Sequence, residues 1–168
     1  MERATVEVAP VDPEDPAAQQ CLRAYEAELN TRFAAGFDPA RSLSVHPEEV
    51  RPPRGLFLVA SLHGDPVGCG ALKFHGDQPA DVKRMWVSQT VRGLGIGRRI
   101  LTELEAHAAG HGVNVLRLET NGALTEAIGL YRSAGYVEVA AFNEEPYSDH
   151  WFEKRIAAVH EQRDDVAG

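Results

Sequence analysis

Cysteines and long apolar runs are both scarce in this sequence. The two cysteines, Cys21 and Cys69, lie far apart and outside any CxxC pair, so we expect free thiols rather than a disulfide framework or a zinc site. No stretch approaches the ~20 apolar residues of a membrane-spanning helix. The first ten residues contain no apolar run fit for a secretory signal. These absences predict a cytoplasmic protein with no membrane partner.

Positive charge is in deficit. The chain has 17 Lys and Arg against 25 Asp and Glu, which gives a formal net charge of -8. Such a charge disfavours nucleic acid and anionic lipid as partners, because both repel an acidic surface. A local basic patch can still bind a small anion.

Internal repeats, low-complexity segments and an evident linker are lacking as well. With 168 residues the chain is long enough to bury one core without disulfides or metals. We therefore expect one domain over residues 1–168. Its core should cover about residues 4–156, and the polar segment 157–168 is expected to fray.

Apolar periodicity and turn residues predict alternating strands and helices. The expected strands are residues 5–9, 56–62, 67–74, 81–88, 113–119, 136–142 and 151–156, and the expected helices are residues 17–33, 98–111 and 125–134. Residues 36–54 are rich in proline and read as a surface loop. A hairpin comes first and a β-α-β-α-β order follows, so the fold class is α/β or α+β with a mixed sheet.

The most informative segment is Arg-Gly-Leu-Gly-Ile-Gly at residues 92–97, followed by Arg98 and Arg99. It lies between a strand and a helix, where unpaired N–H groups carry partial positive charge. Glycines let that backbone approach a bulky oxyanion. Arginines at this end of a helix are unfavourable unless an anion binds there. A solvated turn in which Arg99 pairs with Glu103 is the alternative, but it leaves Arg92 and Arg98 unexplained.

The spacing of the glycines excludes the two common phosphate-binding motifs. A dinucleotide fingerprint starting at Gly93 or Gly95 would put its third glycine on the wrong residue, and no lysine follows Gly97 as a P-loop requires. The remaining pattern, R-x-x-G-x-G, resembles the pyrophosphate motif of the GNAT superfamily of N-acetyltransferases. The block Ala-Ile-Gly-Leu-Tyr at residues 127–131, followed by Gly135 and Tyr136, is similar to that family's second signature. The resemblance spans roughly residues 56–156.

The resemblance implies a single domain with a mixed, mostly antiparallel sheet of six to seven strands, flanked by about four helices and splayed between its central strands. It also implies direct transfer of an acetyl group from acetyl-CoA, the co-substrate, to a primary amine within a ternary complex. The acceptor would be a small-molecule amine or a protein amine. No metal is expected to take part, and the protein could form a homodimer. A non-catalytic acyl-CoA-binding sensor is the alternative, because it would keep the glycine turn without needing Tyr131.

The resemblance also assigns site residues. Tyr131 is similar to the family's general acid, and a phenol with a pKa near 10 is protonated at neutral pH. Asp81 or Glu119 would act as the base or as a relay through water. Asn121 would contact the coenzyme or, equally, cap a turn. The implied coenzyme contacts are Trp86, Val87, Arg92, Gly93, Leu94, Gly95, Ile96, Gly97, Arg98, Asn121 and Tyr131.

The acceptor is expected between the first helix and the last hairpin. Acidic residues among aromatic ones would suit a cationic amine there, although the last hairpin could also be a solvated surface. The preferred acceptor residues are Phe33, Phe37, Glu145, Tyr147 and His150, and further candidates are Glu26, Arg32, Phe142, Glu144 and Trp151. His107 and His111 have the spacing of a helical zinc site, but no third ligand accompanies them, so no metal is expected.

Overall fold

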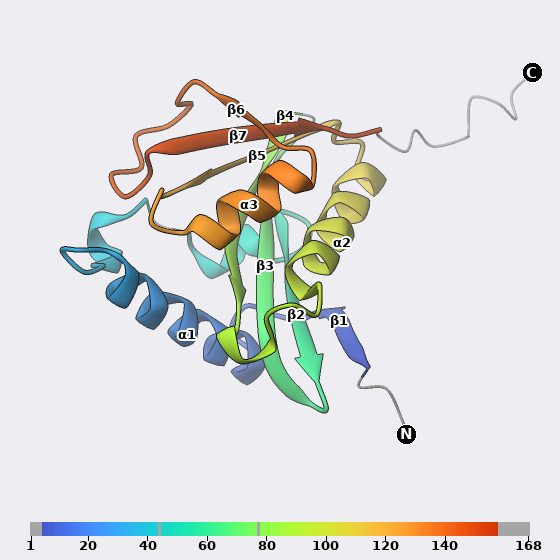
Figure 1. The fold of residues 1–168 in the computed structure, drawn as a ribbon. Coiled ribbons are helices and arrows are strands. Elements are labelled where there is room, and N and C mark those ends of the chain that lie inside the picture. Colours follow the sequence, from blue (N-terminus) through green and yellow to red (C-terminus); the bar gives the residue numbers. More distant parts are fainter. Residues whose placement is uncertain (1–4, 44, 77, 158–168) are drawn as a thin grey trace, which may run out of the picture.

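The computed structural model describes residues 5–43, 45–76 and 78–157. Seven strands form one sheet in the order β1-β2-β3-β4-β5-β7-β6 (Figure 1). The strands are β1 (Val6–Pro10), β2 (Gly55–Leu62), β3 (Asp65–His75), β4 (Gln78–Val87), β5 (Val115–Thr120), β6 (Val137–Val139) and β7 (His150–Arg155). The helices are α1 (Pro16–Arg32), α2 (Ile96–Gly110) and α3 (Thr125–Ser133), with 3-10 turns η1 (Pro39–Arg41), η2 (Pro47–Val50) and η3 (Gln89–Val91).

The expected mixed, mostly antiparallel sheet is confirmed. Neighbouring strands pair antiparallel except β4 and β5, which are parallel. The described residues contain three α-helices rather than about four, because the proline-rich loop forms only the short turns η1 and η2. The strand expected at residues 136–142 ends at Val139, because the chain beyond it turns into a loop. The fray expected at residues 157–168 falls, apart from residue 157, outside the described residues.

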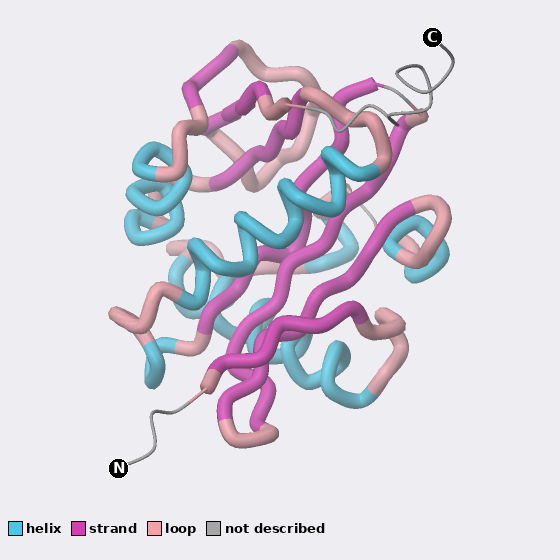
Figure 2. The backbone as a smooth tube through the Cα atoms, turned by 90° about the vertical axis from the view of Figure 1, so that its right-hand side faces the viewer, coloured by secondary structure: helices cyan, strands magenta, loops and turns pink. Residues whose placement is uncertain are grey.

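Successive side chains of β2 point to opposite faces of the sheet, and both faces are buried. Leu58 and Ala60 belong to a core cluster that includes Ile100 and Leu104 of α2. Phe57 belongs to a second cluster, which includes residues of α1. Since successive side chains of a strand point to opposite faces, α1 and α2 cover opposite sides of the sheet. Figure 2 shows helices on either side of the twisted strands.

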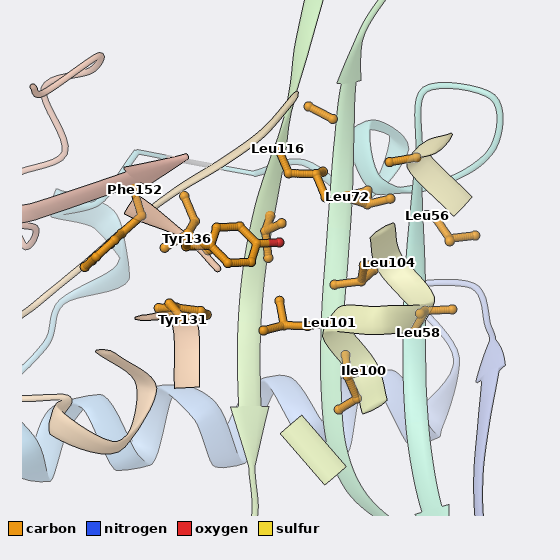
Figure 3. Packing of buried hydrophobic residues seen from close by; sticks show 14 of the residues in the cluster. Leu56, Leu58, Leu72, Ile100, Leu101, Leu104, Leu116, Tyr131, Tyr136 and Phe152 are labelled. Atoms are coloured by element: carbon orange, nitrogen blue, oxygen red, sulfur yellow. The ribbon is translucent and has the colours of Figure 1, made fainter. Parts of the chain in front are cut away.

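Helix α2 packs unusually close to β3. A Cβ atom at Gly70 would lie 2.8 Å from Cγ2 of Ile100 and 3.0 Å from Cδ1 of Leu104. Only a glycine leaves room for these side chains at that point of the strand. The contact fixes the position of α2 and therefore of the glycine turn at its start. Figure 3 shows Ile100, Leu101 and Leu104 of this helix beside the sheet.

The sheet opens between β4 and β5. These strands pair only at Ala80 with Leu116 and at Asp81 with Arg117, whereas β4 stays paired with β3 as far as Val87. The register between β3 and β4 shifts near Arg84, whose φ of 57° is left-handed, and such a bulge bends a strand. The expected splay between the central strands is thereby confirmed, and β5 and β7 turn away from β4 (Figure 1).

Candidate functional site

Two adjoining cavities lie beside β4 where it leaves β5, and the smaller one lies between these two strands. The larger, of about 450 Å³, lies between α1, the end of β4, the turn at residues 92–98 and α3. The smaller, of about 90 Å³, lies between β4, β5, the segment after α1 and the loop around residues 145–148. The residues that line both are Tyr25, Leu29, Met85, Leu124, Ala127 and Tyr131.

The glycine turn forms part of the larger cavity. Gly95 is the N-cap of α2, has a φ of 72° and offers no side chain to the first N–H groups of the helix. Gly93 is also left-handed, with a φ of 89°, a conformation that glycine adopts without steric cost. The first turn of α2 contains no acidic residue. The helix start therefore presents its N–H groups and partial positive charge to the cavity, which is the arrangement of an anion site.

The arginines of this turn have more partners than the sequence suggested. Arg92 pairs with Glu28 at 3.0 Å and with Glu126 at 3.1 Å, and Arg98 donates to the hydroxyl of Ser133. The expectation that a solvated turn leaves these two arginines unexplained is therefore wrong. Because the partner helices α1 and α3 are remote in sequence, no local pattern indicates these contacts. Arg99 lies 4.0 Å from Glu103, as the alternative predicted.

Four other predicted coenzyme residues have clear positions. Trp86 and Val87, at the end of β4, line the larger cavity. Leu94 is 59% exposed and is not among the lining residues, so its predicted contact is not supported. A Cβ atom at Gly97 would lie 2.9 Å from Cδ2 of Leu130, so this glycine also lets α2 approach α3.

Tyr131 lies where the two cavities meet. Its side chain is 5% exposed, and no hydrogen-bond partner for its hydroxyl occurs among the described residues. Burial raises the pKa of Tyr131 above its ordinary value, and the neighbouring Tyr25 and Glu119 act in the same direction. The phenol therefore stays protonated at neutral pH and can donate a proton. Figure 3 shows Tyr131 near Tyr136 and Phe152 at the edge of the core.

The end of α3 fixes the position of this tyrosine. The N–H of Tyr136 donates to the carbonyl of Tyr131 at 3.0 Å, and the N–H of Gly135 donates to that of Arg132 at 3.1 Å. Gly135 has a φ of 95°. This is the Schellman pattern, in which Gly135 is the left-handed residue that follows the helix end.

Glu119 and Lys83 form an ion pair in the smaller cavity. The Nζ of Lys83 lies 2.5 Å from Oε1 of Glu119, and both side chains are largely buried. The second oxygen, Oε2 of Glu119, is buried and has no hydrogen-bond partner among the described residues. A buried carboxylate oxygen without a donor is costly, so this atom is a ready acceptor for an N–H or water proton.

Asp81 has a different environment from the one expected. It does not open β4, which starts three residues earlier, and it lines neither cavity. Its carboxylate lies 2.6 Å from Nε of Arg117 and 2.8 Å from Nε2 of His75. Burial alone would raise the pKa of Asp81, but these two hydrogen bonds outweigh it and lower the pKa. The geometry therefore favours a structural role for Asp81, and of the two predicted bases Glu119 is the one that lines a cavity.

Asn121 has the second of its two predicted roles, the turn cap, and His150 does not line the predicted acceptor site. The amide of Asn121 donates to the carbonyl of Tyr147 at 2.7 Å and accepts from the N–H of Ala123 at 2.8 Å. It lines the smaller cavity only, so the turn-capping interpretation is the one its geometry supports. The ring of His150 points to Glu138 at 2.7 Å and is absent from both cavity linings, because its strand carries it to the outer hairpin.

Four of the five preferred acceptor residues line the smaller cavity. Phe33, Phe37 and Tyr147 line the smaller cavity, and their ring centroids lie 4.8 to 6.1 Å apart. Glu145 accepts hydrogen bonds from the hydroxyl of Ser42 and from the N–H of Leu43 at 2.7 Å. Its carboxylate therefore holds the loop after α1 in place, in addition to lining the cavity.

Sequence reasoning missed Tyr25, Lys83, Arg84 and Met85, which all line the smaller cavity. The last three follow the point where β4 leaves β5. The available signal was the charged pair Lys83-Arg84, which has apolar residues on both sides, since charges are uncommon on a strand buried on both faces.

Comparison with known proteins agrees with this geometry. Residues 20–136 match the acetyltransferase (GNAT) family. The chain is 41% identical over 92 residues to an IAA acetyltransferase of Azospirillum brasilense, covering 54% of this chain and 59% of that protein. It is 33% identical over 125 residues to the N-alpha-acetyltransferase RimI of Mycobacterium tuberculosis, covering 73% of each.

The fold has solved counterparts too. A GNAT-family acetyltransferase from Staphylococcus aureus superposes with a TM-score of 0.73 at 15% identity, covering 90% of this chain and 99% of that one. The chain spans about three fifths of the length of the first curated relatives it matches. Among the described residues, no helix has the length and apolar character to cross a membrane, and no cluster of three potential metal ligands occurs.

The ion pairs of Asp81 generate a stability prediction. Because the pKa of Asp81 is lower in the folded than in the unfolded chain, its ionised form stabilises the fold above pH ~4, and that contribution is lost as pH falls through the folded pKa. Asp81→Asn should lower the free energy of unfolding by about 1–3 kcal/mol at pH 7, and the difference should shrink below pH 4. Urea unfolding between pH 3 and 7 measures it.

The matched control is Asp12→Asn, which removes the more exposed pair with Arg51 and should change stability little. Equal effects of the two substitutions at pH 7 would show that Asp81 does not have the structural role assigned to it.

Proposed function

This chain belongs to the GNAT acetyltransferase family, and from that premise we propose that it is an N-acetyltransferase that moves an acetyl group from acetyl-CoA to a primary amine. Transfer is direct, within a ternary complex of enzyme, acetyl-CoA and acceptor. The acceptor is a small-molecule or protein amine. The observation that carries the proposal is the position of Tyr131, which lies between a cavity bounded by an anion-binding helix start and a cavity bounded by a buried carboxylate.

The larger cavity fits coenzyme A. Members of this family use acetyl-CoA, and the N–H groups around Gly95 would hold its pyrophosphate. Arg92 would exchange Glu28 or Glu126 for the phosphate oxygens. The exchange costs least at Glu126, whose side chain is 54% exposed, because an exposed ion pair contributes little. The end of β4, at Trp86 and Val87, would line the path of the pantetheine arm.

The chemistry requires two proton transfers. The amine nitrogen forms a bond to the acetyl carbon as the carbon–sulfur bond breaks. The departing thiolate takes a proton from the hydroxyl of Tyr131, whose raised pKa keeps it protonated until then. The amine loses its proton to Oε2 of Glu119, directly or through a water. Lys83 orients that carboxylate through the ion pair with Oε1.

Coenzyme binding can be tested at the glycine turn with a matched pair of variants. Gly95 and Gly112 flank opposite ends of α2, have φ values of 72° and 80°, and neither has an atom within 4 Å of an added Cβ. Valine at either position brings a similar strain of about 1–2 kcal/mol. Gly95→Val should weaken coenzyme A binding by about tenfold or more, measured by calorimetry, whereas Gly112→Val should not. Equal affinities in both variants would contradict the assigned anion site.

Tyr131→Phe should leave coenzyme A affinity unchanged and slow turnover by about 10²–10⁴-fold, because it removes only the donated proton. The control is Tyr136→Phe, which removes a buried hydroxyl that bonds to Glu105 at 3.0 Å, outside both cavities. Acetyl-CoA consumption across a panel of amines is the measurement. Full activity of Tyr131→Phe would reduce Tyr131 to a packing residue. Intact coenzyme binding without turnover of any amine would favour the non-catalytic sensor.

The role of Glu119 can be separated from that of Asp81 by the pH dependence of kcat/KM. Glu119→Gln should lower kcat/KM by about 10²-fold or less and alter the rise of the profile with pH, whereas Asp81→Asn should overlay the parent. Because Glu119→Gln leaves Lys83 buried without its partner, the double variant with Lys83→Met checks that the loss is not a folding defect. If the Glu119→Gln profile also overlays the parent, the acceptor arrives already deprotonated and Glu119 is not the base.

A further inference from the structure

The charges around the smaller cavity are unevenly paired. Two cationic residues, Lys83 and Arg84, and two anionic residues, Glu119 and Glu145, line it. Lys83 and Glu119 neutralise each other at 2.5 Å. Glu145 receives hydrogen bonds from Ser42, Leu43 and Tyr147. Within the described part of the chain, Arg84 has no carboxylate within ion-pair distance.

The side chain of Arg84 is nevertheless held at the cavity. Its guanidinium carbon lies 5.9 Å from the ring centroid of Tyr25, and Tyr25 lines both cavities. The residue is half-buried and sits at the bulge of β4 with a φ of 57°. A left-handed φ is uncommon outside glycine, and glycine would adopt it here at lower steric cost. The presence of an arginine at this position therefore indicates a use for its side chain.

We propose that Arg84 binds a carboxylate carried by the acceptor, which makes the acceptor a small amino acid rather than a simple alkylamine. The inference rests on the acetyltransferase function proposed above and specifies its substrate class. A guanidinium presents parallel N–H donors that match the two oxygens of a carboxylate. In a half-buried site with no internal carboxylate partner, that pairing does not have to displace an existing ion pair.

The rest of the cavity is consistent with such an acceptor. Oε2 of Glu119 lacks a donor and would accept an N–H from the amine end, next to Tyr131. Phe33, Phe37 and Tyr147 provide an apolar wall for a side chain. A cavity of about 90 Å³ favours a molecule of few atoms. A zwitterion would thus meet an opposite charge at each end, whereas an alkylamine would leave Arg84 without a carboxylate partner.

The test compares each small amino acid with its carboxamide, for example alanine with alaninamide and valine with valinamide. Each pair keeps the amine and the side chain and differs in the carboxylate. The parent enzyme should acetylate the acids with the lower KM. Arg84→Gln should raise KM for the acids by about 10- to 100-fold, the range for a hydrogen bond to a charged group, and leave KM for the carboxamides unchanged. For the acids, the KM of Arg84→Lys should lie between the KM of the parent and that of Arg84→Gln.

Arg155→Gln is the control for loss of one positive charge, because Arg155 ends β7 away from both cavities. Lower KM values of the parent for the carboxamides, or for a peptide with an amidated C-terminus, would overturn the proposal. So would an equal effect of Arg84→Gln on acids and carboxamides, which would mean that Arg84 only shapes the strand.

Calorimetry of amino-acid binding to the complex with coenzyme A separates this proposal from the transferase function. If Arg84→Gln abolishes the binding of acids while the parent acetylates no amine, the carboxylate site stands and the transferase function fails. If the parent acetylates amines but binds acids no better than carboxamides, the transferase function stands and the carboxylate site fails.

Discussion

The early separation of β4 from β5 is the feature on which the site depends. Two parallel strands that stayed paired in this register would bring residues 82–84 against residues 118–120 and leave no space between them. Instead the pairing stops after Asp81 and Arg117. The ion pair between these two residues holds the strands together at the point where they part, and the bulge at Arg84 bends β4 away from β5. The smaller cavity and the Lys83–Glu119 pair lie in the opening that results, and the larger cavity adjoins it at Tyr131.

The opening places groups of different polarity side by side. The start of α2 offers N–H groups on one side of Tyr131, and a buried carboxylate lies on the other. The negative charge of Glu119 raises the pKa of Tyr131 and so helps to keep the phenol protonated. The close contact of α2 with Gly70 and the Schellman end of α3 hold these groups on rigid elements. Such preorganisation is what direct acetyl transfer would require.

Local patterns in the sequence predicted what depends on local structure. Helix α1 begins and ends within one residue of the expected 17–33, and the glycine turn and the block ending in Tyr136 indicated the elements around the larger cavity. Contacts between distant segments could not be predicted. The partners of Arg92 come from α1 and α3, Arg117 lies 36 residues from Asp81, and the bulge at Arg84 depends on register with β3. The contact between Arg117 and Asp81 engages that carboxylate away from the cavity, which Glu119 lines instead.

The most direct test of this account is a crystal structure of the protein with bound acetyl-CoA. The account predicts that the pyrophosphate contacts the N–H groups at residues 95–98, that the pantetheine arm follows the end of β4, and that the thioester sulfur lies within about 3–4 Å of the Tyr131 hydroxyl, close enough for proton donation. A coenzyme bound elsewhere, or one whose sulfur is separated from Tyr131 by other side chains, would contradict it.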